Sequence, residues 1–440
     1  MSRHAMAANR LLGLVSCLVM GGPLSAQGPH APLPSPLTLE QALKLADQSH
    51  PERELAEAAL LKARAEQAGV AVTNDLQVHF SAALSAIDPS PVATNQSHND
   101  SWARLRLSKQ LSDFGRTEHA LAAADAARQG QSWQLLDVRQ QRRLQVMARF
   151  FDVLLSDLEH ARDNEAMANT YVQLDRARSR NELSQLSDIE LLELESIYQR
   201  ARLRANASQQ KQRITRSLLA VSLDRPDDLP ADLVYPPTLE PIPPQEIEVL
   251  TQQALASNPS LRALRAEVTV LEQRLQAAAA DDNPVLRAEF EAASYNRDLS
   301  GRNPLTASLV LEVPLSRGGW IDAQIARERA QLQENRAKLR AYELELRQQL
   351  LEQWLELQRL RIRREELLVT GDFRDLYLER SRSLYDLEFA SDLGDSMTQI
   401  ADLHLQQAEN DLQIRLTRAR LEALTGTLLP GIDVTTTTDD

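Results

Sequence analysis

The chain has 440 residues, a net charge of −13 at pH 7 and an isoelectric point near 5.3. Because it is acidic and has no basic stripe, its composition argues against binding to nucleic acid. Its one cysteine, Cys17, excludes a disulfide framework.

The N-terminal residues have the three-part plan of a secretory signal. A basic start is followed by an apolar run over residues 11–22 and by small residues around Ala26. We expect residues 1–26 to be a signal peptide; its removal takes away two positive charges, so that −13 becomes −15. The run is too short to span a bilayer, which needs roughly 20 apolar residues, and no later run is long enough either.

A second interpretation of this segment is that it directs lipidation. The sequence LVSC at residues 14–17 resembles a lipobox, in which Cys17 would carry the lipid and become the first residue. The apolar run continues past Cys17, which favours plain cleavage. Both interpretations predict export.

The rest of the chain is one unit of about 200 residues that occurs twice. His50-Pro51 aligns with Asn258-Pro259, and LSDFGR at 111–116 aligns with LSRGGW at 315–320. We therefore divide the chain into a first repeat over 27–234, a proline-rich linker over 235–244, a second repeat over 245–430 and a flexible tail over 431–440.

Both repeats predict the same order of elements. A short helix ends at the His-Pro or Asn-Pro step, because the residue before proline avoids helical angles. A helix of about 22 residues follows, from Pro51 and from Pro259. In the first repeat we then expect strands over 76–86 and 102–112, a long helix over 116–180 and a helix over 187–222. In the second we expect strands over 285–295 and 305–315, a long helix over 319–384 and a helix over 392–425.

The helices predict a rod. Apolar residues recur every seven positions in the second long helix, at Ile325, Leu332, Leu339 and Leu346, as in a coiled-coil seam. A helix of 65 residues is roughly 98 Å long, and the two shorter helices of the first repeat together reach roughly 88 Å. The shorter helices would therefore lie end to end beside the long one. The fold class is mainly α with a small β part.

The four strands alternate apolar and polar side chains over about 10 residues, the length that crosses a bilayer at a tilt. This alternation is typical of membrane barrels, although a soluble sheet packed on helices has it too. Four strands cannot close a barrel, and open edges are not viable in lipid, so several chains would share one. The polar face would then line water, with mixed charges that suggest pairing across strands: Arg104, Arg106, Arg287, Glu289, Glu291 and Glu312.

From about residue 37 to 430 the sequence resembles the TolC-like outer-membrane efflux proteins. The markers are LTLEQALKLADQSHPE at the start, the turns LSDFGR and LSRGGW, FFDVLL at 150–155 and ARLEALTG at 419–426. The resemblance implies a homotrimer in outer-membrane lipid, with a shared 12-stranded barrel and an α-helical tunnel into the periplasm. It also implies docking to a periplasmic adaptor and to an inner-membrane transporter.

Two acids at the start of the last helix are the clearest candidates for a functional site. Asp392 and Asp395 can share a helical face. Acids in a first helical turn stabilise the helix by roughly 0.3–1 kcal/mol each, because they interact with the positive end of its dipole. The resemblance implies a different role, in which three copies of Asp392 and of Asp395 form rings at the periplasmic aperture. Asp188 of the other repeat is a third candidate for this aperture. Helix tips are expected at 181–187 and 387–391. In the second tip Glu388 stands where the resemblance leads us to expect an arginine that latches the aperture.

Nothing in the sequence indicates an enzyme, a cofactor or a metal site. G-x-S-x-G, P-loop and H-E-x-x-H motifs are absent, and the histidines, among them His119 and His160, lack ligand spacing and would be solvated or lumenal. The main hypothesis is an exit duct for a tripartite efflux or type I secretion system. The alternative is a periplasmic coiled-coil scaffold with no channel.

Overall fold

The computed structural model describes residues 32–48, 50–237, 246–297, 299, 301–387 and 392–429. The expected signal peptide with Cys17, the centre of the linker, the second helix tip with Glu388 and the C-terminal tail lie outside these residues. Within them the chain is mainly helical and contains one four-stranded antiparallel sheet, which confirms the predicted fold class at this level.

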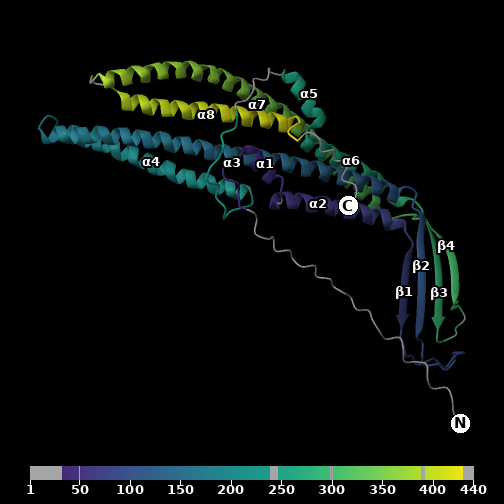
Figure 1. The fold of residues 1–440 in the computed structure, drawn as a ribbon. Coiled ribbons are helices and arrows are strands. Elements are labelled where there is room, and N and C mark those ends of the chain that lie inside the picture. The colour runs from purple at the N-terminus through teal and green to yellow at the C-terminus, as the bar shows by residue number, and fades with distance from the viewer. Residues whose placement is uncertain are drawn as a thin grey trace, which may run out of the picture.

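The same order of elements occurs in both halves of the chain (Figure 1). The first half contains α1 (Leu39–Ala46), α2 (Pro51–Ala71), β1 (Gln77–Ala83), β2 (Trp102–Ser112), α3 (Arg116–Glu182) and α4 (Asp188–Ser222). The second contains α5 (Ile247–Ser257), α6 (Pro259–Ala279), β3 (Val285–Tyr295), β4 (Leu305–Glu312), α7 (Trp320–Asp386) and α8 (Leu393–Leu424). Short 3₁₀ turns, Val72–Asn74 and Ala280–Asp282, precede β1 and β3.

The sheet joins the two halves. Its order is β1-β2-β3-β4, so the central pair, β2 and β3, comes from different halves. The register pairs Leu105 with Ala292 and Arg106 with Glu291, and a bulge interrupts it between Gln110 and Ser112. At the end of the sheet near the helices, β2 continues into the turn before α3, and β4 continues into the turn before α7.

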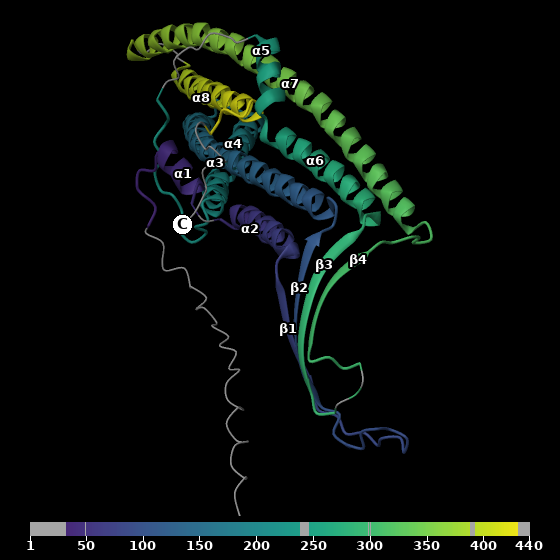
Figure 2. The same ribbon diagram turned by 90° about the vertical axis from the view of Figure 1, so that its right-hand side faces the viewer.

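The helices form a second, longer layer. α3 and α7 have 67 residues each, which makes each about 100 Å long at 1.5 Å per residue. Figure 2 shows α8 and α6 in line between α3 and α7, while α2 and α4 lie along the other side of α3. The end-to-end stacking expected from the helix lengths is therefore present in both halves.

Each long helix starts at a glycine with a left-handed backbone. Gly115 (φ 104°) and Gly319 (φ 78°) precede the first residues of α3 and α7. Residues with a Cβ rarely adopt these angles, so the LSDFGR and LSRGGW motifs supply the turn that passes the chain from strand to helix.

Two apolar clusters hold the middle of the rod. The first lies where α1 meets α3 and α4 and is centred on Phe150, which is fully buried; burying such a side chain stabilises by roughly 2–3 kcal/mol. The second lies where α5 covers α7 and α8 and includes Leu346 and Leu421. The expected seam residues Leu332 and Leu346 are buried, and Leu339 packs against the second cluster.

Candidate functional site

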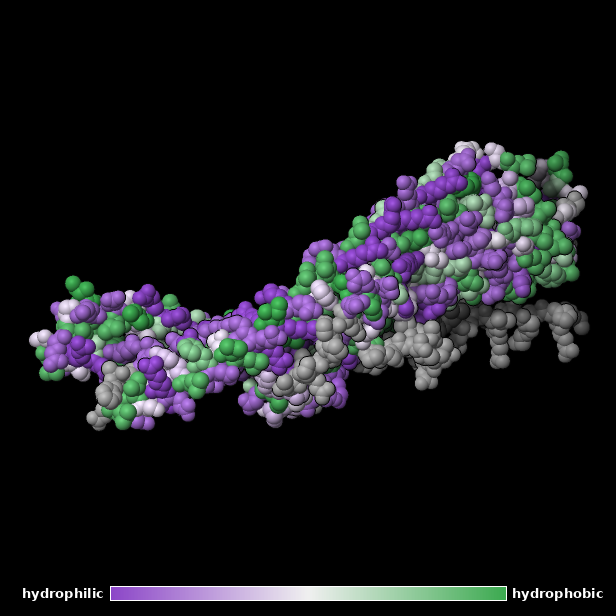
Figure 3. All heavy atoms as spheres, turned by 90° about the horizontal axis from the view of Figure 1, so that it is seen from above, coloured by the Kyte–Doolittle hydropathy of each residue, from purple (hydrophilic) through white to green (hydrophobic). Residues whose placement is uncertain are grey.

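The sheet has one apolar face. Its register brings Phe80, Leu105 and Ala292 into one row and Val78, Leu107 and Phe290 into the next. β4 extends this face with Leu305, Ala307, Leu309 and Leu311. The face is uncovered: Phe80 is 72% and Leu309 71% exposed. Figure 3 shows hydrophobic side chains gathered at the end of the molecule that carries the sheet.

The opposite face carries the six charged residues that the sequence singled out. Glu291 of β3 forms ion pairs with two arginines of β2: Arg104 Nε lies at 3.1 Å, and Arg106 Nη2 donates a hydrogen bond at 3.0 Å. Arg287 and Glu289, both on β3, approach to 3.9 Å. Glu312 stands on the same face at the end of β4, opposite Val285. The charges of the two signs are therefore largely paired with each other.

The loops beyond the far end of the sheet are tied together by two arginines of the β3–β4 connection. Arg302 binds the Asp100 carboxylate with nitrogen–oxygen distances of 2.7 and 3.2 Å, and its hydrogen bond lowers the pKa of Asp100. The buried Arg297 donates to the carbonyl of Asn95 at 2.6 Å. Sequence reasoning missed this contact, because both partners lie in loops without a periodic pattern.

At the other end of the rod, Asp392 is held by the neighbouring helix. It occupies the N-cap position of α8, but its side chain makes no capping hydrogen bond. Instead its carboxylate accepts from the hydroxyls of Tyr377 and Ser381 on α7, the latter at 2.8 Å. These two hydrogen bonds lower the pKa of Asp392. Asp392 therefore joins α7 to α8, and these hydrogen bonds favour its charged form.

Asp395 joins the two halves of the chain. Its Oδ1 accepts from Asn169 Nδ2 on α3 at 2.8 Å. Asp188, in contrast, accepts from Asn181 at 3.0 Å within its own α3–α4 hairpin. Ser187 and Glu190 form a capping box there. The structure thus brings Asp392 and Asp395 together at the start of α8 and places Asp188 on the other hairpin.

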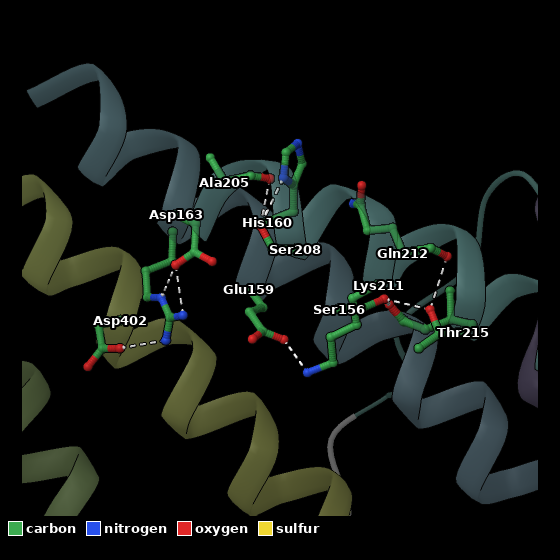
Figure 4. Close-up of polar contacts among 12 residues, drawn as sticks. Ser156, Glu159, His160, Asp163, Ala205, Ser208, Lys211, Gln212, Thr215 and Asp402 are labelled. Carbon is green, nitrogen blue, oxygen red and sulfur yellow. Dashed lines mark hydrogen bonds and ion pairs between the residues drawn. The ribbon is translucent and has the colours of Figure 1, made fainter. Parts of the chain in front are cut away.

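Between the tip and the apolar clusters, polar contacts connect α3 to its neighbours (Figure 4). Arg162 of α3 binds Asp163 at 2.8 Å and reaches Asp402 of α8 at 3.2 Å. On the other side of α3, the hydroxyls of Ser156 and Thr215 lie 2.8 Å apart. These contacts fix both neighbours of α3 at one level of the rod.

Two histidines that the sequence analysis treats as solvated or lumenal have structural partners. His160 Nδ1 lies 3.3 Å from Ser208 Oγ of α4, as Figure 4 shows. His119 Nδ1 lies 3.0 Å from Gln273 Oε1 of α6. Both rings are half-buried, so each contributes to the packing of α3.

In the part of the chain that the structure describes, no group of three or more His, Cys, Asp or Glu side chains could hold a metal ion. Within the same residues, no helix combines the length and the apolar character that crossing a membrane requires.

No protein-family model matches the sequence, and no curated protein matches it either. Solved structures do match the fold. The Campylobacter jejuni CmeC outer membrane channel matches with a TM-score of 0.75 and 13% identity, over 90% of this chain and 87% of that one. The outer membrane protein VceC from Vibrio cholerae matches with a TM-score of 0.69 and 16% identity, over 88% and 96%. The open state of the Neisseria gonorrhoeae MtrE outer membrane channel matches with a TM-score of 0.66 and 15% identity, over 89% of each chain.

These likenesses define the class of fold: the chain has the architecture of bacterial outer-membrane channels. It is the TolC-like fold that the sequence markers predicted.

Proposed function

We propose that three copies of this chain form an outer-membrane channel that is the exit duct of a tripartite efflux or type I secretion system. The observation that carries this proposal is the sheet, which has an uncovered apolar face, a charged opposite face and two outer strands, β1 and β4, each paired on one side only. In lipid, unpaired backbone groups cost several kcal/mol each, so the sheet needs further strands on both edges.

A trimer satisfies these edges. Three copies supply twelve strands, four from each, which exceeds the eight strands of the smallest membrane barrels. The apolar face then contacts lipid, and the face with Arg104, Arg106, Arg287, Glu289, Glu291 and Glu312 lines the water-filled lumen. Because these charges largely pair with each other, the barrel selects weakly for the sign of a solute's charge.

The helical layer has uncovered edges of its own. Apolar side chains at coiled-coil spacing lie exposed along α7: Leu344, Leu351, Leu355, Ile362, Val369, Phe373 and Leu376. A second exposed set lies along α2 and α4, at Leu55, Leu61, Ile189, Leu192, Leu203 and Ile214. We infer that α7 of one protomer packs against α2 and α4 of the next, which closes the helices into a tunnel.

The length of the helices fits a duct that reaches into the periplasm. With α3 and α7 about 100 Å long, the tips lie far from the sheet, where a periplasmic adaptor and an inner-membrane transporter would dock. The duct conducts passively, and the transporter supplies the work. Three copies of Asp392, Asp395 and Asp188 near the tips would surround the periplasmic aperture with acids.

The duplication and the export signal complete the proposal. The repeated order of elements supports an origin of the two halves by internal duplication. Residues 1–26 direct export, and either cleavage after Ala26 or lipidation of Cys17 follows. Acyl labelling of the wild type and of Cys17→Ser distinguishes these two outcomes.

Fractionation and conductance test the duct against the scaffold alternative. We expect the full chain to remain in washed outer membranes, to run as a trimer in native mass spectrometry in detergent and to form channels in planar bilayers. A monomeric chain found only in the soluble periplasmic fraction would instead support a coiled-coil scaffold. The uncovered apolar face of the sheet favours the duct.

A further inference from the structure

A cavity of about 550 Å³ lies where the start of α6 meets the end of α8, between α3 and α7. Its volume falls in the range of small-molecule sites, roughly 300–1,000 Å³. Asp137 and Leu144 of α3, Tyr342 and Gln353 of α7, and Leu416 and Arg420 of α8 contribute to its wall. It is therefore an open pocket lined by elements of a single protomer.

Asn258 fixes the geometry of this junction. Its Oδ1 accepts from the backbone N–H of Leu261 at 2.9 Å, which caps α6, and its Nδ2 donates to the carbonyl of Leu424 at 3.0 Å. The Tyr342 hydroxyl donates to the same Oδ1 at 3.4 Å. The Asn-Pro step noted in the sequence thus holds α6, α7 and α8 around the cavity.

Asp137 lies in the wall of the cavity without a counter-ion. Its carboxylate accepts from the hydroxyl of Ser260, and burial raises its pKa. Among the described residues no cation pairs with it; Arg420 lies in the same wall but is exposed. Asp137 is half-buried, and a carboxylate partly removed from water without a cation is costly, so this site favours a positively charged partner.

A second acceptor in the wall has no partner. Oε1 of Gln353 is buried and accepts no hydrogen bond from the described residues. A buried acceptor without a donor is costly, because folding removes it from water and gives it no hydrogen bond in return. Asp137 and Gln353 together offer acceptors on α3 and α7, and among the described residues neither accepts a hydrogen bond from an N–H group.

The corresponding junction of the first half contains a cation supplied by the chain. There Arg142 is 3% exposed and donates to the carbonyl of Ser222 at 2.7 Å. Its other nitrogen lies 2.9 Å from His50 Nε2. Counted from the first residues of the two long helices, the position of Arg142 corresponds to Leu346. The second junction therefore has no arginine at this position.

We propose that this cavity binds a small organic cation through a primary ammonium group. The ammonium donates to the carboxylate of Asp137 and to Oε1 of Gln353, and Leu144 and Leu416 contact its short apolar body. A metal ion fits less well, because Asp137 is the one acid of the wall. If the ligand also carries a carboxylate, Arg420 at the rim binds it.

Calorimetry on the purified full chain in detergent tests the proposal with two probes, n-butylammonium and 5-aminopentanoate, and with n-butanol as the neutral reference. We expect saturable binding of one ammonium probe per chain and none of butanol. Asp137→Asn should weaken binding about tenfold or more, since hydrogen bonds to charged groups contribute roughly 1.5–3 kcal/mol, and Gln353→Leu should weaken it too. The matched control is Asp152→Asn, which removes the same charge from α3 at a residue that pairs with Arg149; it should bind like the wild type.

The two probes identify the source of the ammonium. Tighter binding of 5-aminopentanoate that is lost in Arg420→Gln indicates an amino-acid-like ligand, and equal binding indicates a simple amine. Binding that survives Asp137→Asn, the absence of saturable binding, or displacement by Mg²⁺ alone would overturn the proposal. Because the assay needs no conductance, a negative result here leaves the channel proposal untouched.

Discussion

The hydroxyl of Tyr377 on α7 donates a hydrogen bond to the carboxylate of Asp392 at the start of α8. Three residues further along α8, Asp395 accepts from Asn169 of α3. The two acids are thus anchored to different helices, one within the α7–α8 hairpin and one across the two halves of the chain. The hydrogen bonds to Asp392 favour its charged form, and negative charge is the property that a ring of acids at an aperture needs.

If the aperture is lined by these acids, the double variant Asp392→Ala with Asp395→Ala should abolish block of single channels by multivalent cations. The physical reason is that three copies of each acid concentrate negative charge around one axis. Trimer assembly should be unaffected. If conductance and block stay as in the wild type while α8 loses stability, the acids act only within their helix.

The hydrogen bond from Tyr377 predicts how that block depends on pH. Because the pKa of Asp392 is lowered from its ordinary value of 3.8, its charge persists as the pH falls toward that value and is lost only below it. In Tyr377→Phe the charge, and with it the block, should be lost at a higher pH than in the wild type. Single-channel recordings from pH 7 to pH 3 measure this. Identical profiles for the two proteins would show that Asp392 does not set the block.

The exposed apolar stripe of α7 predicts the oligomeric state. Ile362 is 69% exposed in the protomer, and in the proposed trimer it is covered by the neighbouring chain. Ile362→Glu places a charge in that interface, which desolvation makes costly, so native mass spectrometry should show monomers. The conservative Ile362→Val is the control and should remain trimeric. A trimer that tolerates the glutamate would place the interface on another face.

The two faces of β2 predict opposite responses to the same substitution. Leu107 pairs with Val78 and Phe290 on the apolar face, whereas its neighbour Ser108 pairs with Gln77 and Glu289 on the charged face. An arginine on the lipid face near the bilayer midplane costs roughly 2–4 kcal/mol. Leu107→Arg should therefore reduce the amount of protein in the outer membrane, while Ser108→Arg should not. Equal recovery of both variants would argue for a sheet outside lipid.

Local sequence signals account for much of the fold. The alternation in β2 and the glycine turn before α3 are properties of short segments, and the structure has the strand over Trp102–Ser112 and the left-handed Gly115. The fourth strand, expected over 305–315, ends at Glu312, just before Pro314, because proline cannot donate to the sheet ladder.

The side-chain partners in the candidate sites could not be predicted in the same way. Asp392 has the local pattern of a first-turn acid, but its partner Tyr377 comes from the antiparallel helix before it. Asn169 and Asp395 are more than 200 positions apart in the sequence, and so are Asn95 and Arg297. Such contacts depend on how helices and loops from different halves pack, which periodicity does not specify.

Asp137 predicts a pH-dependent stability that a variant should remove. Burial raises its pKa above the ordinary value of 3.8, so the folded chain holds this proton more tightly than the unfolded chain. Since stability falls with pH wherever the unfolded state binds fewer protons, this contribution is full below about pH 3.8 and is lost as the pH rises through the folded pKa. The asparagine side chain in Asp137→Asn cannot ionise, so the variant should not lose stability in this way. Thermal unfolding in detergent from pH 4 to pH 7 should therefore show that the melting temperature of the variant rises relative to that of the wild type as the pH rises.

Tyr342, the other titratable group of the wall, has a raised pKa and does not ionise in this range. A constant difference between the two proteins across the range would show that the Asp137 carboxyl is as well solvated in the folded chain as in the unfolded one.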